Sequence, residues 1–432
     1  MNHFFHRRLL CLLAVLLAAL LHTACGGSSD DDGGGTSQVR LVNATTDYAS
    51  LDLYADDAPG SKDTASFTAG NYVPLASGTR ALALRRSGSA TTVSTSSRPL
   101  SAGAYQTLVA YGTENALRTA YMTDGEAAPG GGKAKLRVLN AGIDAGSLDT
   151  YVFPADAPLA EQVPSVASQQ PETLSLYREF AQGSYRVVVT APGSKTDVRL
   201  DLPAVALADQ QIATLVLTTT PGGVLVHGLL VNQRGEVAAK KNPLARIRLV
   251  AGSTAGGTVS AKANGVTLSV GVASPAIVPY VTVPAGALAG ELRVNGGAAV
   301  ALPGFTAQPG ADLTLLVSGT PAAPTTTFLQ DNNKPPATGN AKLRVAHGVN
   351  GLAGNVTLTA DYGLVANDIP FGTASAAASL ATGNAYRLEV TSPAATSRLY
   401  LNTEASLQSA RIYTVFMLGD AAAPVGTLVR DR

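Results

Sequence analysis

Four short stretches of this sequence decide its fold, because they open four copies of one unit. They read Val39-Arg40-Leu41-Val42-Asn43-Ala44, Leu136-Arg137-Val138-Leu139-Asn140-Ala141, Ile247-Arg248-Leu249-Val250-Ala251-Gly252 and Leu343-Arg344-Val345-Ala346-His347-Gly348. Successive arginines are 97, 111 and 96 residues apart. In each stretch an apolar residue precedes and follows the arginine, which is the alternation of a β-strand. A repeat of this length that opens on a strand predicts tandem β domains.

Other strands recur in the same order in every copy. A second strand follows each opening, at Leu51–Tyr54, Leu148–Tyr151, Val259–Lys262 and Val356–Thr359. An apolar strand comes late in each copy, at Gln106–Tyr111, Ala213–Leu217, Leu313–Val317 and Tyr413–Leu418. A closing strand follows a turn, at Thr119–Thr123, Val224–Val231, Thr325–Leu329 and Gly426–Val429. Asn264-Gly265 and Asn295-Gly296 indicate two further hairpins, because Asn-Gly readily adopts positive φ.

These patterns predict an all-β chain of tandem immunoglobulin-like β-sandwich domains with about seven strands each. A single large propeller or barrel is the alternative architecture, and it is disfavoured because one propeller blade needs only roughly 40–50 residues. The expected order is a signal peptide at 1–24, a flexible tether at 25–37, and Ig-like repeats at 38–126, 134–233, 244–332 and 340–432. Stretches rich in glycine, proline and polar residues indicate linkers at 125–133, 233–243 and 319–340.

The N-terminal segment has the form of a secretory signal. Arg7 and Arg8 precede Leu9–Leu21, an apolar run of 13 residues that is shorter than the roughly 20 of a spanning helix. Leu21-His22-Thr23-Ala24-Cys25 then resembles the lipobox of bacterial lipoproteins, although His22 stands where an aliphatic residue is usual. We therefore expect cleavage before Cys25 and lipidation of its thiol. The alternative is an ordinary cleaved signal that leaves Cys25 unmodified.

The composition around Cys25 supports an anchor. The other cysteine of the chain, Cys11, lies in the segment that cleavage removes, so the mature chain can form neither an internal disulfide nor a thiolate metal cluster. Residues 26–37 are glycine, serine, aspartate and threonine, which have no apolar surface to bury and predict a solvated tether. Gly26 and Gly27 replace the aspartate that retains enteric lipoproteins in the inner membrane. We therefore expect export and anchoring in the outer membrane.

Several of these motifs resemble a known family. The opening strands, together with Leu51-Asp52-Leu53-Tyr54, Phe67-Thr68-Ala69-Gly70, Pro370-Phe371-Gly372-Thr373 and the Gly-x-Tyr-Arg of 183–186, resemble the bacterial envelope domains known as domain of unknown function 4397. The resemblance implies a secreted or lipid-anchored protein with tandem immunoglobulin-like domains. It brings with it no known catalytic residue.

Catalytic motifs are missing from the sequence. It has no Gly-x-Ser-x-Gly elbow, no P-loop, no dinucleotide-binding glycine motif and no His-Glu-x-x-His. After signal cleavage only His227 and His347 remain, in different copies, and we expect strand or turn residues rather than metal ligands or bases. His347 stands where Asn43 and Asn140 stand, which predicts a local hydrogen bond at a strand end. We therefore expect a protein that is not an enzyme and needs no cofactor or metal.

Recurrent polar and aromatic residues have structural explanations. The four arginines of the opening strands lie opposite the apolar face, so we expect them to be solvated or salt-bridged, with Asp52 and Asp149 as natural partners. A ligand-binding ladder of arginines is the alternative. We expect five tyrosines to pack in cores or on sheet surfaces, with a sugar-binding platform as the alternative. They are Tyr54, Tyr105, Tyr111, Tyr121 and Tyr151.

Charge and composition narrow the classes of molecule that we expect as binding partners. Loss of residues 1–24 removes Arg7 and Arg8, which leaves 29 basic against 30 acidic side chains. This balance gives no electrostatic reason to expect nucleic acid as a partner. The expected partners are the membrane, through the lipid, and an envelope protein or glycan. We therefore expect an envelope protein that acts in structure or interaction. A carbohydrate- or peptide-binding receptor or adhesin is the alternative.

Overall fold

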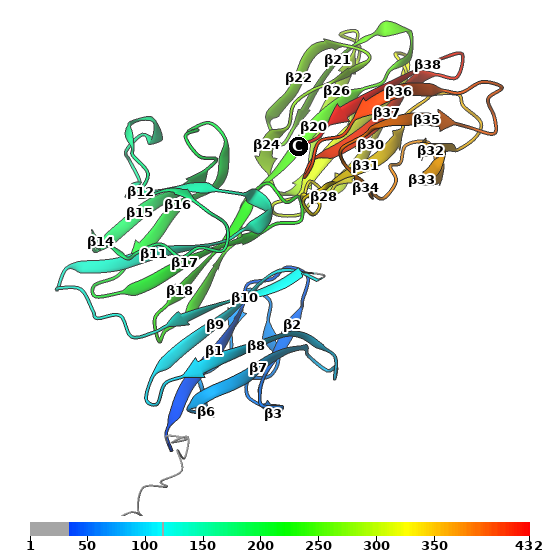
Figure 1. The fold of residues 1–432 in the computed structure, drawn as a ribbon. Coiled ribbons are helices and arrows are strands. Elements are labelled where there is room, and N and C mark those ends of the chain that lie inside the picture. The colour runs from blue at the N-terminus through cyan, green and yellow to red at the C-terminus, as the bar shows by residue number, and fades with distance from the viewer. Residues whose placement is uncertain (1–33, 115) are drawn as a thin grey trace, which may run out of the picture.

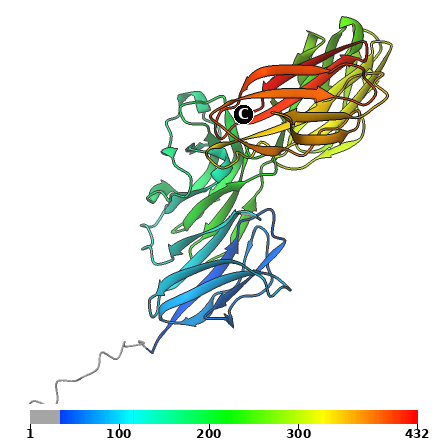
Figure 2. The same cartoon turned by 45° about the vertical axis from the view of Figure 1, so that its right-hand side comes forward.

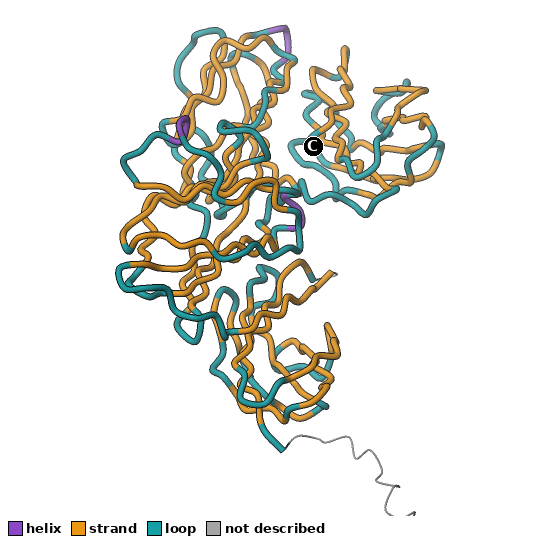
Figure 3. Tube along the Cα trace, turned by 60° about the vertical axis from the view of Figure 1, so that its left-hand side comes forward, coloured by secondary structure: helices purple, strands orange, loops and turns teal. Residues whose placement is uncertain are grey.

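The computed structural model describes residues 34–114 and 116–432, which are built almost entirely of β-strands. The strands form four β-sandwiches in chain order, which we number 1 to 4 (Figure 1). The prediction of an all-β chain of tandem immunoglobulin-like sandwiches is confirmed. Three short 3₁₀ turns lie in connecting loops of the described chain (Figure 3). They are η1 (Ile143–Ala145), η2 (Leu159–Glu161) and η3 (Thr254–Gly256).

Sandwich 1 has one sheet of order β10-β9-β1-β5, with β6 also paired to β1, and a second of order β3-β2-β7-β8, with β4 paired to β2. Its strands are β1 (Thr36–Asn43), β2 (Ser50–Ala55), β3 (Ala58–Pro59), β4 (Thr64–Ala65), β5 (Thr68–Ala69), β6 (Val73–Ala76), β7 (Gly78–Arg86), β8 (Thr92–Leu100), β9 (Tyr105–Thr113) and β10 (Ala116–Thr123). Sandwich 2 has sheets β14-β11-β17-β18-β19 and β13-β12-β15-β16. Its strands are β11 (Lys133–Ala141), β12 (Leu148–Pro154), β13 (Val166–Gln169), β14 (Arg178–Ala181), β15 (Gly183–Thr190), β16 (Val198–Leu207), β17 (Ile212–Thr219), β18 (Val226–Asn232) and β19 (Val237–Lys240).

Sandwich 3 has sheets β23-β20-β29-β30, with β24 also paired to β20, and β22-β21-β26-β27, plus the pair β25-β28. Its strands are β20 (Leu244–Ala251), β21 (Thr258–Ala263), β22 (Val266–Ala273), β23 (Ala276–Ile277), β24 (Val281–Pro284), β25 (Gly286–Leu288), β26 (Gly290–Val294), β27 (Val300–Ala301), β28 (Phe305–Ala307), β29 (Asp312–Thr320) and β30 (Ala323–Asp331). Sandwich 4 has sheets β34-β31-β37-β38 and β33-β32-β35-β36. Its strands are β31 (Asn340–His347), β32 (Val356–Ala360), β33 (Gly363–Ile369), β34 (Ala378–Ala381), β35 (Ala385–Thr391), β36 (Tyr400–Ser406), β37 (Ile412–Asp420) and β38 (Ala423–Arg430).

One pairing plan is common to all four sandwiches. The opening strand runs parallel to the late strand, and the late strand forms an antiparallel hairpin with the closing strand. The register always sets the arginine of the opening strand beside a threonine of the late strand. The pairs are Arg40 with Thr107, Arg137 with Thr214, Arg248 with Thr314 and Arg344 with Thr414. We call the sheet that contains the opening strand the opening sheet.

The strand count and two linkers differ from expectation. The sandwiches have eight to eleven strands rather than about seven, because short strands such as β4 and β5 pair beside the main ladders. The segment 233–243, expected to be a linker, contains β19, because a turn with Arg234 at φ 53° folds the chain back onto β18. The segment 319–340 begins inside the β29–β30 hairpin, since the closing strand starts at Ala323. The Asn264-Gly265 hairpin forms as predicted, with φ of 46° and 78°.

Each sandwich has an apolar core between its two sheets, and the outer faces of the opening sheets are buried as well. The opening sheets of sandwiches 1 and 2 share one apolar cluster, and those of sandwiches 3 and 4 share another. The first cluster comprises Val42, Ala44, Phe67, Val109, Tyr111, Met122, Leu139, Ala141, Val216, Leu229 and Val231. The second comprises Val250, Leu316, Leu329, Ala346, Phe416 and Leu418. The chain therefore forms two pairs of sandwiches, each pair four sheets thick.

The two pairs lie in an elongated, bent array. Sandwich 1 is at one extremity and sandwiches 3 and 4 are at the other, while sandwich 2 connects them (Figures 1 and 2). The equivalent arginines of the pairs, Arg40 and Arg248, are 208 residues apart, and Arg137 and Arg344 are 207 residues apart. The near-equal spacing indicates that the pair, and not only the single sandwich, is a repeated unit of this fold.

Candidate functional site at the arginine interfaces

Cys25, the lipidation site predicted from the sequence, lies outside the described residues. Its role stays a prediction. The polar groups with the most unusual surroundings in the described chain are the arginines of the opening strands.

Arg40 extends from β1 into the interface between sandwiches 1 and 2, where it is 3% exposed. Its Nε donates to Thr107 Oγ1 at 2.8 Å. Its Nη1 and Nη2 donate to the carbonyl oxygens of Gly235 and Asn232 in sandwich 2, at 2.6 and 2.7 Å. The Thr107 hydroxyl in turn donates to Asp124 Oδ2 at 2.6 Å. The guanidinium therefore joins two sandwiches through every one of its nitrogen atoms.

In sandwiches 3 and 4, the arginine of each opening strand forms an ion pair with an aspartate of the other sandwich. Arg248 Nη1 donates to Asp431 Oδ1 at 2.5 Å, and Asp431 directly follows the closing strand of sandwich 4. Arg344 Nη2 pairs with Asp331, the last residue of the closing strand of sandwich 3. Arg248 and Arg344 are 3% and 6% exposed. Two buried ion pairs thus cross the same interface in opposite directions.

Arg137 is the exception among the four. Its Nε donates to Thr214 Oγ1 at 3.0 Å, and its guanidinium lies 4.3 Å from the centroid of the Tyr177 ring. Gln233 occupies the position, two residues beyond the partner of the threonine, where the other sandwiches have aspartate. With no aspartate there, Arg137 is only partly buried, and burial lowers its pKa.

We expected solvated or salt-bridged arginines: Arg248 and Arg344 are salt-bridged, whereas Arg40 is neither, because it is buried against a hydroxyl and two backbone carbonyls. Alternation does place them opposite their own core, but a neighbouring sandwich covers that face. The expected partners are also wrong. Asp52 accepts from the Asp63 amide and the Ser87 hydroxyl, at 2.8 and 2.6 Å. Asp149 likewise accepts from the backbone amides of Ser168 and Gly193, at 2.6 and 2.8 Å. Both carboxylates stabilise turns within their own sandwich.

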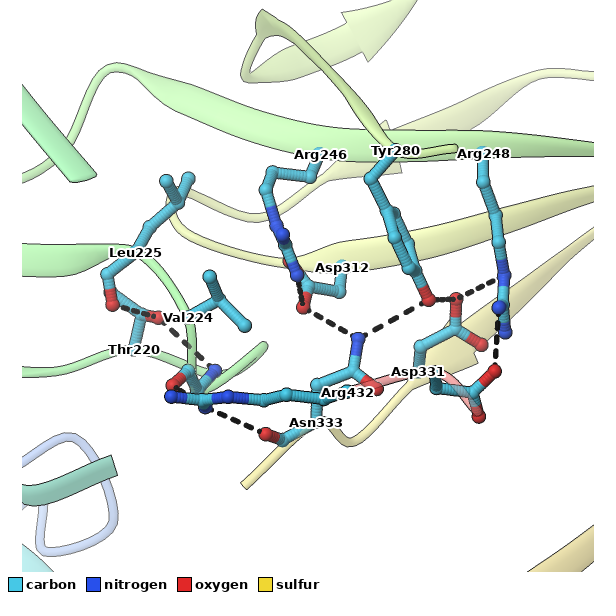
Figure 4. A network of polar contacts seen from close by, with 12 residues as sticks. Thr220, Val224, Leu225, Arg246, Arg248, Tyr280, Asp312, Asp331, Asn333 and Arg432 are labelled. Atoms are coloured by element: carbon cyan, nitrogen blue, oxygen red, sulfur yellow. Dashed lines mark hydrogen bonds and ion pairs between the residues drawn. The ribbon is translucent and has the colours of Figure 1, made fainter. Parts of the chain in front are cut away.

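A second network joins sandwich 3 to the chain that leads into sandwich 4 (Figure 4). Arg246 holds the fully buried Asp312 carboxylate through two hydrogen bonds of 2.8 and 2.5 Å. Asn333 Nδ2 donates to the same carboxylate at 2.8 Å and to the Tyr280 hydroxyl at 3.2 Å. The Tyr280 hydroxyl donates to Asp331 Oδ2 at 2.6 Å, which connects this network to the Arg248–Asp331–Arg344 cluster.

A loop of sandwich 2 docks against this network. The Gly222 amide donates to the Gly310 carbonyl at 3.1 Å, and the Gly222 carbonyl accepts from the Asn333 amide at 3.1 Å. Arg432 Nη1 donates to the Gly223 carbonyl at 2.8 Å. A Cβ on Gly222 would lie 2.7 Å from the Asp312 backbone nitrogen, and Gly223 has φ 82°. Only glycine permits this close approach of the backbones.

The surroundings shift several pKa values. Burial lowers the pKa of Arg248, but Tyr280, Asp431 and Asp331 outweigh that effect and raise it overall. Burial and the Asp331 charge raise the pKa of Tyr280 well above its usual value, so the phenol stays a donor. Burial lowers the pKa of Arg432 to about 10, and the nearby charges of Arg199 and Arg246 act in the same direction. Arg248 and Arg432 therefore remain charged at neutral pH.

His227 has a structural role at the interface between sandwiches 1 and 2, and His347 has one at the end of β31 in sandwich 4. His227 Nδ1 accepts from the Asn242 amide at 3.0 Å, and its ring lies edge-on to Phe67 of sandwich 1, with centroids 5.3 Å apart. His347 Nδ1 accepts from the Val349 amide at 3.3 Å. Asn43 Oδ1 and Asn140 Oδ1 accept from amides two residues further on in the same way. The predicted local hydrogen bond of His347 is confirmed.

The five tyrosines expected to pack do so. Tyr111 and Tyr151 are 3% and 2% exposed. The ring of Tyr54 lies 4.0 Å from the Arg85 guanidinium, that of Tyr105 lies 4.2 Å from Arg234, and that of Tyr121 lies 5.7 Å from Arg98. One face of each of these three rings is therefore covered by an arginine of the protein itself.

Three clefts adjoin the arginine interfaces. A cleft of about 500 Å³ is lined by Arg40, Tyr72 and Arg234, among others. One of about 410 Å³ lies beside Asp312 and Lys334, and one of about 280 Å³ lies beside Arg344 and Asp431. Among the described residues, no group of three or more His, Cys, Asp or Glu side chains is placed to hold a metal ion. These surfaces offer charged and aromatic groups suited to binding.

A sequence signal for the interfaces exists but is easily missed. Thr107 and Asp124 are 17 residues apart, as are Thr314 and Asp331, and Thr414 and Asp431. Each pair joins the arginine of an opening strand to the end of a closing strand. The constant spacing follows from the hairpin that the late and closing strands form. The inter-sandwich partner of each arginine has no such spacing, because it depends on how two sandwiches pack.

The fold and its interfaces define a protein of tandem β-sandwiches that are joined in pairs by buried arginines. The family model described as Domain of unknown function (DUF4397) matches residues 37–151 and 245–352, which is more than half of the chain, and the chain belongs to this family. Each match covers the first sandwich of a pair and the opening strand of the second, and the match at 37–151 also includes most of β12. Sandwich 3 therefore matches as fully as sandwich 1.

Some solved structures show limited likeness. A candidate cell adhesion protein from Bacteroides uniformis is 16% identical over 46% of this chain and 98% of its own, with a TM-score of 0.21. One from Parabacteroides distasonis is 12% identical over 70% and 98%, with a TM-score of 0.17. The Bacillus anthracis TIE protein is 11% identical over 85% and 68%, with a TM-score of 0.15. No curated protein shows significant similarity. No functional conclusion follows from TM-scores this low.

Replacement of Arg344 by methionine tests the buried ion pairs. Arg344→Met leaves the Asp331 carboxylate buried without its main cation, so we expect the free energy of unfolding to fall by about 3–5 kcal/mol. Urea unfolding measures this change. Adding Asp331→Asn should recover part of the loss, because the uncompensated charge is then removed.

Lys133→Met is the matched control, since Lys133 and Glu179 form an exposed pair with side chains 55% and 45% exposed. We expect a change of about 0–1 kcal/mol there. A loss in Arg344→Met no larger than in this control would contradict a stabilising role.

The environment of His227 predicts that the folded protein loses stability in acid. Burial, and then the charge of Lys241, lower its pKa from 6.5 to about 4. Between these pH values the unfolded chain binds a proton that the folded chain does not, so stability falls as pH decreases. The loss attributable to His227 should approach about 3 kcal/mol below pH 4. His227→Asn keeps an acceptor for the Asn242 amide but does not titrate, so its unfolding free energy should decline less over this range. An equal decline in the unfolding free energy of the two proteins over this pH range would exclude this role.

Proposed function

We propose that this chain is a lipid-anchored protein of the cell envelope whose four sandwiches form one rigid arm. The arm holds interaction surfaces at a fixed distance and orientation from the membrane. The observation that carries this proposal is that successive sandwiches are joined by buried interfaces.

The interface between sandwiches 1 and 2 resists hinge motion. Separating them would expose an apolar cluster that includes Val42, Val216 and Leu229, each 0% exposed. It would also strip Arg40 of two carbonyl acceptors. Apolar exposure is unfavourable by about 25 cal/mol for each Å². Sandwiches 3 and 4 have both an apolar cluster and two crossed ion pairs, so the same argument holds there.

The junction between sandwiches 2 and 3 is rigid for a different reason. Asn242, which links them, is 0% exposed. Its side-chain amide donates to the carbonyls of Arg199 and Val226 at 2.7 and 3.0 Å, and its Oδ1 accepts from the Leu244 amide at 3.0 Å. The loop at Gly222 docks on the same region. Buried hydrogen bonds thus join sandwiches 2 and 3, whereas an apolar cluster joins the two sandwiches within each pair.

Anchoring follows from the sequence. A secretory signal, a lipobox-like site at Cys25 and the polar residues 26–37 support export, acylation and a solvated tether before the arm. Gly26 and Gly27 support placement in the outer membrane. The near-neutral charge supports an envelope protein or glycan, rather than nucleic acid, as the partner of the arm.

Distance measurements between spin labels test the rigidity. Labels at Ser101→Cys in sandwich 1 and Ala422→Cys in sandwich 4, placed in a Cys25→Ser chain that has no other mature thiol, should give one narrow distance distribution. Leu229→Asp puts a charge into the apolar cluster between sandwiches 1 and 2, so it should broaden the distribution. Val163→Asp, at a residue that is 82% exposed, is the control and should not. A broad distribution in the parent chain would refute the rigid arm.

Lipidation is tested by intact mass. The membrane-extracted protein should begin at Cys25 and carry acyl mass. Cys25→Ser should abolish the acyl mass and release the protein from the membrane fraction. Ser29→Ala, in the same tether, should change neither property. A mature chain that begins elsewhere and carries no acyl group would overturn the anchor.

A further inference from the structure

Three sandwiches place a tyrosine at one position where the fourth has alanine. In each sandwich, the residue just before the arginine of the opening strand pairs with a residue on an adjacent strand. The position in question is the residue that immediately precedes this pairing partner. The defining pairs are Val39 with Val73, Leu136 with Arg178, Ile247 with Val281 and Leu343 with Ala378. The equivalent residues are therefore Tyr72, Tyr177, Tyr280 and Ala377.

Each tyrosine covers its own arginine. The guanidinium carbons of Arg40, Arg137 and Arg248 lie 4.8, 4.3 and 4.8 Å from the centroids of the tyrosine rings. Where aspartate stands at the end of the closing hairpin, the phenol also donates to it. Tyr72 donates to Asp124 Oδ2 at 2.7 Å, and Tyr280 donates to Asp331 Oδ2 at 2.6 Å. The repeat thus builds a slot that recognises a phenol by its face and by its hydroxyl.

Sandwich 4 keeps the slot and lacks the ring. Arg344 still donates to Thr414 Oγ1 at 2.9 Å, and the Thr414 hydroxyl still donates to Asp431 Oδ2 at 2.6 Å. Asp431 Oδ2 has no second donor among the described residues, whereas Asp124 and Asp331 each accept from a tyrosine there as well. The cleft of about 280 Å³ lies here, lined by Arg344, Ala377 and Asp431. Ala377 is exposed, so the cleft opens to solvent.

We propose that this cleft binds the phenol ring of a ligand, with the ring against Arg344 and the hydroxyl donating to Asp431. The ligand would reproduce the contacts that Tyr280 makes within sandwich 3. Cation–π attraction from a desolvated guanidinium and a charge-assisted hydrogen bond both favour a neutral phenol. The cleft volume is close to the lower end for small-molecule sites, roughly 300 Å³. This inference goes beyond the rigid arm and is independent of lipid anchoring.

Binding of p-cresol to the full mature chain tests the proposal. Ligand-observed NMR should detect saturable binding of p-cresol. Toluene, which lacks the hydroxyl, should bind at least fivefold more weakly. Benzoate should also bind more weakly, because its charge would oppose Asp431. N-acetyltyrosine amide distinguishes the sources: binding indicates that a tyrosine side chain of a partner fits, and binding of p-cresol alone indicates a small free phenol.

A substitution that fills the cleft with a side chain of the protein itself gives the second test. Ala377→Tyr restores the tyrosine of the other sandwiches, so it should reduce p-cresol binding at least tenfold and raise the melting temperature. Ala377→Phe should also block the cleft without supplying the hydroxyl. Ala422→Tyr, in the exposed turn between β37 and β38, should leave binding unchanged. Absence of saturable p-cresol binding to the parent chain, or equal binding to folded Ala377→Tyr, would overturn the proposal.

Discussion

Burial of a charged guanidinium between two sheets is the constraint on which the rest of the structure depends. A guanidinium taken out of water must find acceptors for its N–H groups, or the fold loses several kcal/mol. Arg40 meets this need with Thr107 and two backbone carbonyls of sandwich 2. Arg248 and Arg344 meet it with aspartates of each other's sandwich. Because these acceptors lie on the neighbour, the requirement fixes the position of one sandwich against the next.

The pairing of sandwiches explains features that a single sandwich would not. Opening strands such as β1 are buried on both faces, since one face joins their own core and the other joins the shared cluster. In both pairs the family match starts three residues before the opening-strand arginine of the first sandwich and extends into the second sandwich. The two pairs are then joined by polar contacts and by glycines at 222 and 223, where a side chain would collide with Asp312 and with Lys334 respectively. An elongated array of four sandwiches results.

The repeats also show how one interface can take on another use. Tyr72, Tyr177 and Tyr280 each lie against the guanidinium of their own arginine. At Ala377 the same framework of arginine, threonine and aspartate remains, while the ring is missing. A structural element of three sandwiches therefore leaves an open, preorganised slot in the fourth. Preorganisation matters because the arginine and the carboxylate are already held by other contacts.

The sequence alone determined the all-β class, the four repeats and the strand order, because alternation, Asn-Gly turns and the repeated arginine are local signals. It also predicted the hydrogen-bonding role of His347, which depends on neighbours two residues away. It did not determine that Arg40, Arg248 and Arg344 are buried, nor that Asp331 and Asp431 rather than Asp52 and Asp149 are the acidic residues of the arginine interfaces. Alternation shows which side of a strand a residue occupies. Whether that side meets water or another sandwich was decided only by the tertiary structure, since apolar residues far apart in the chain, such as Val42 and Val216, come together there.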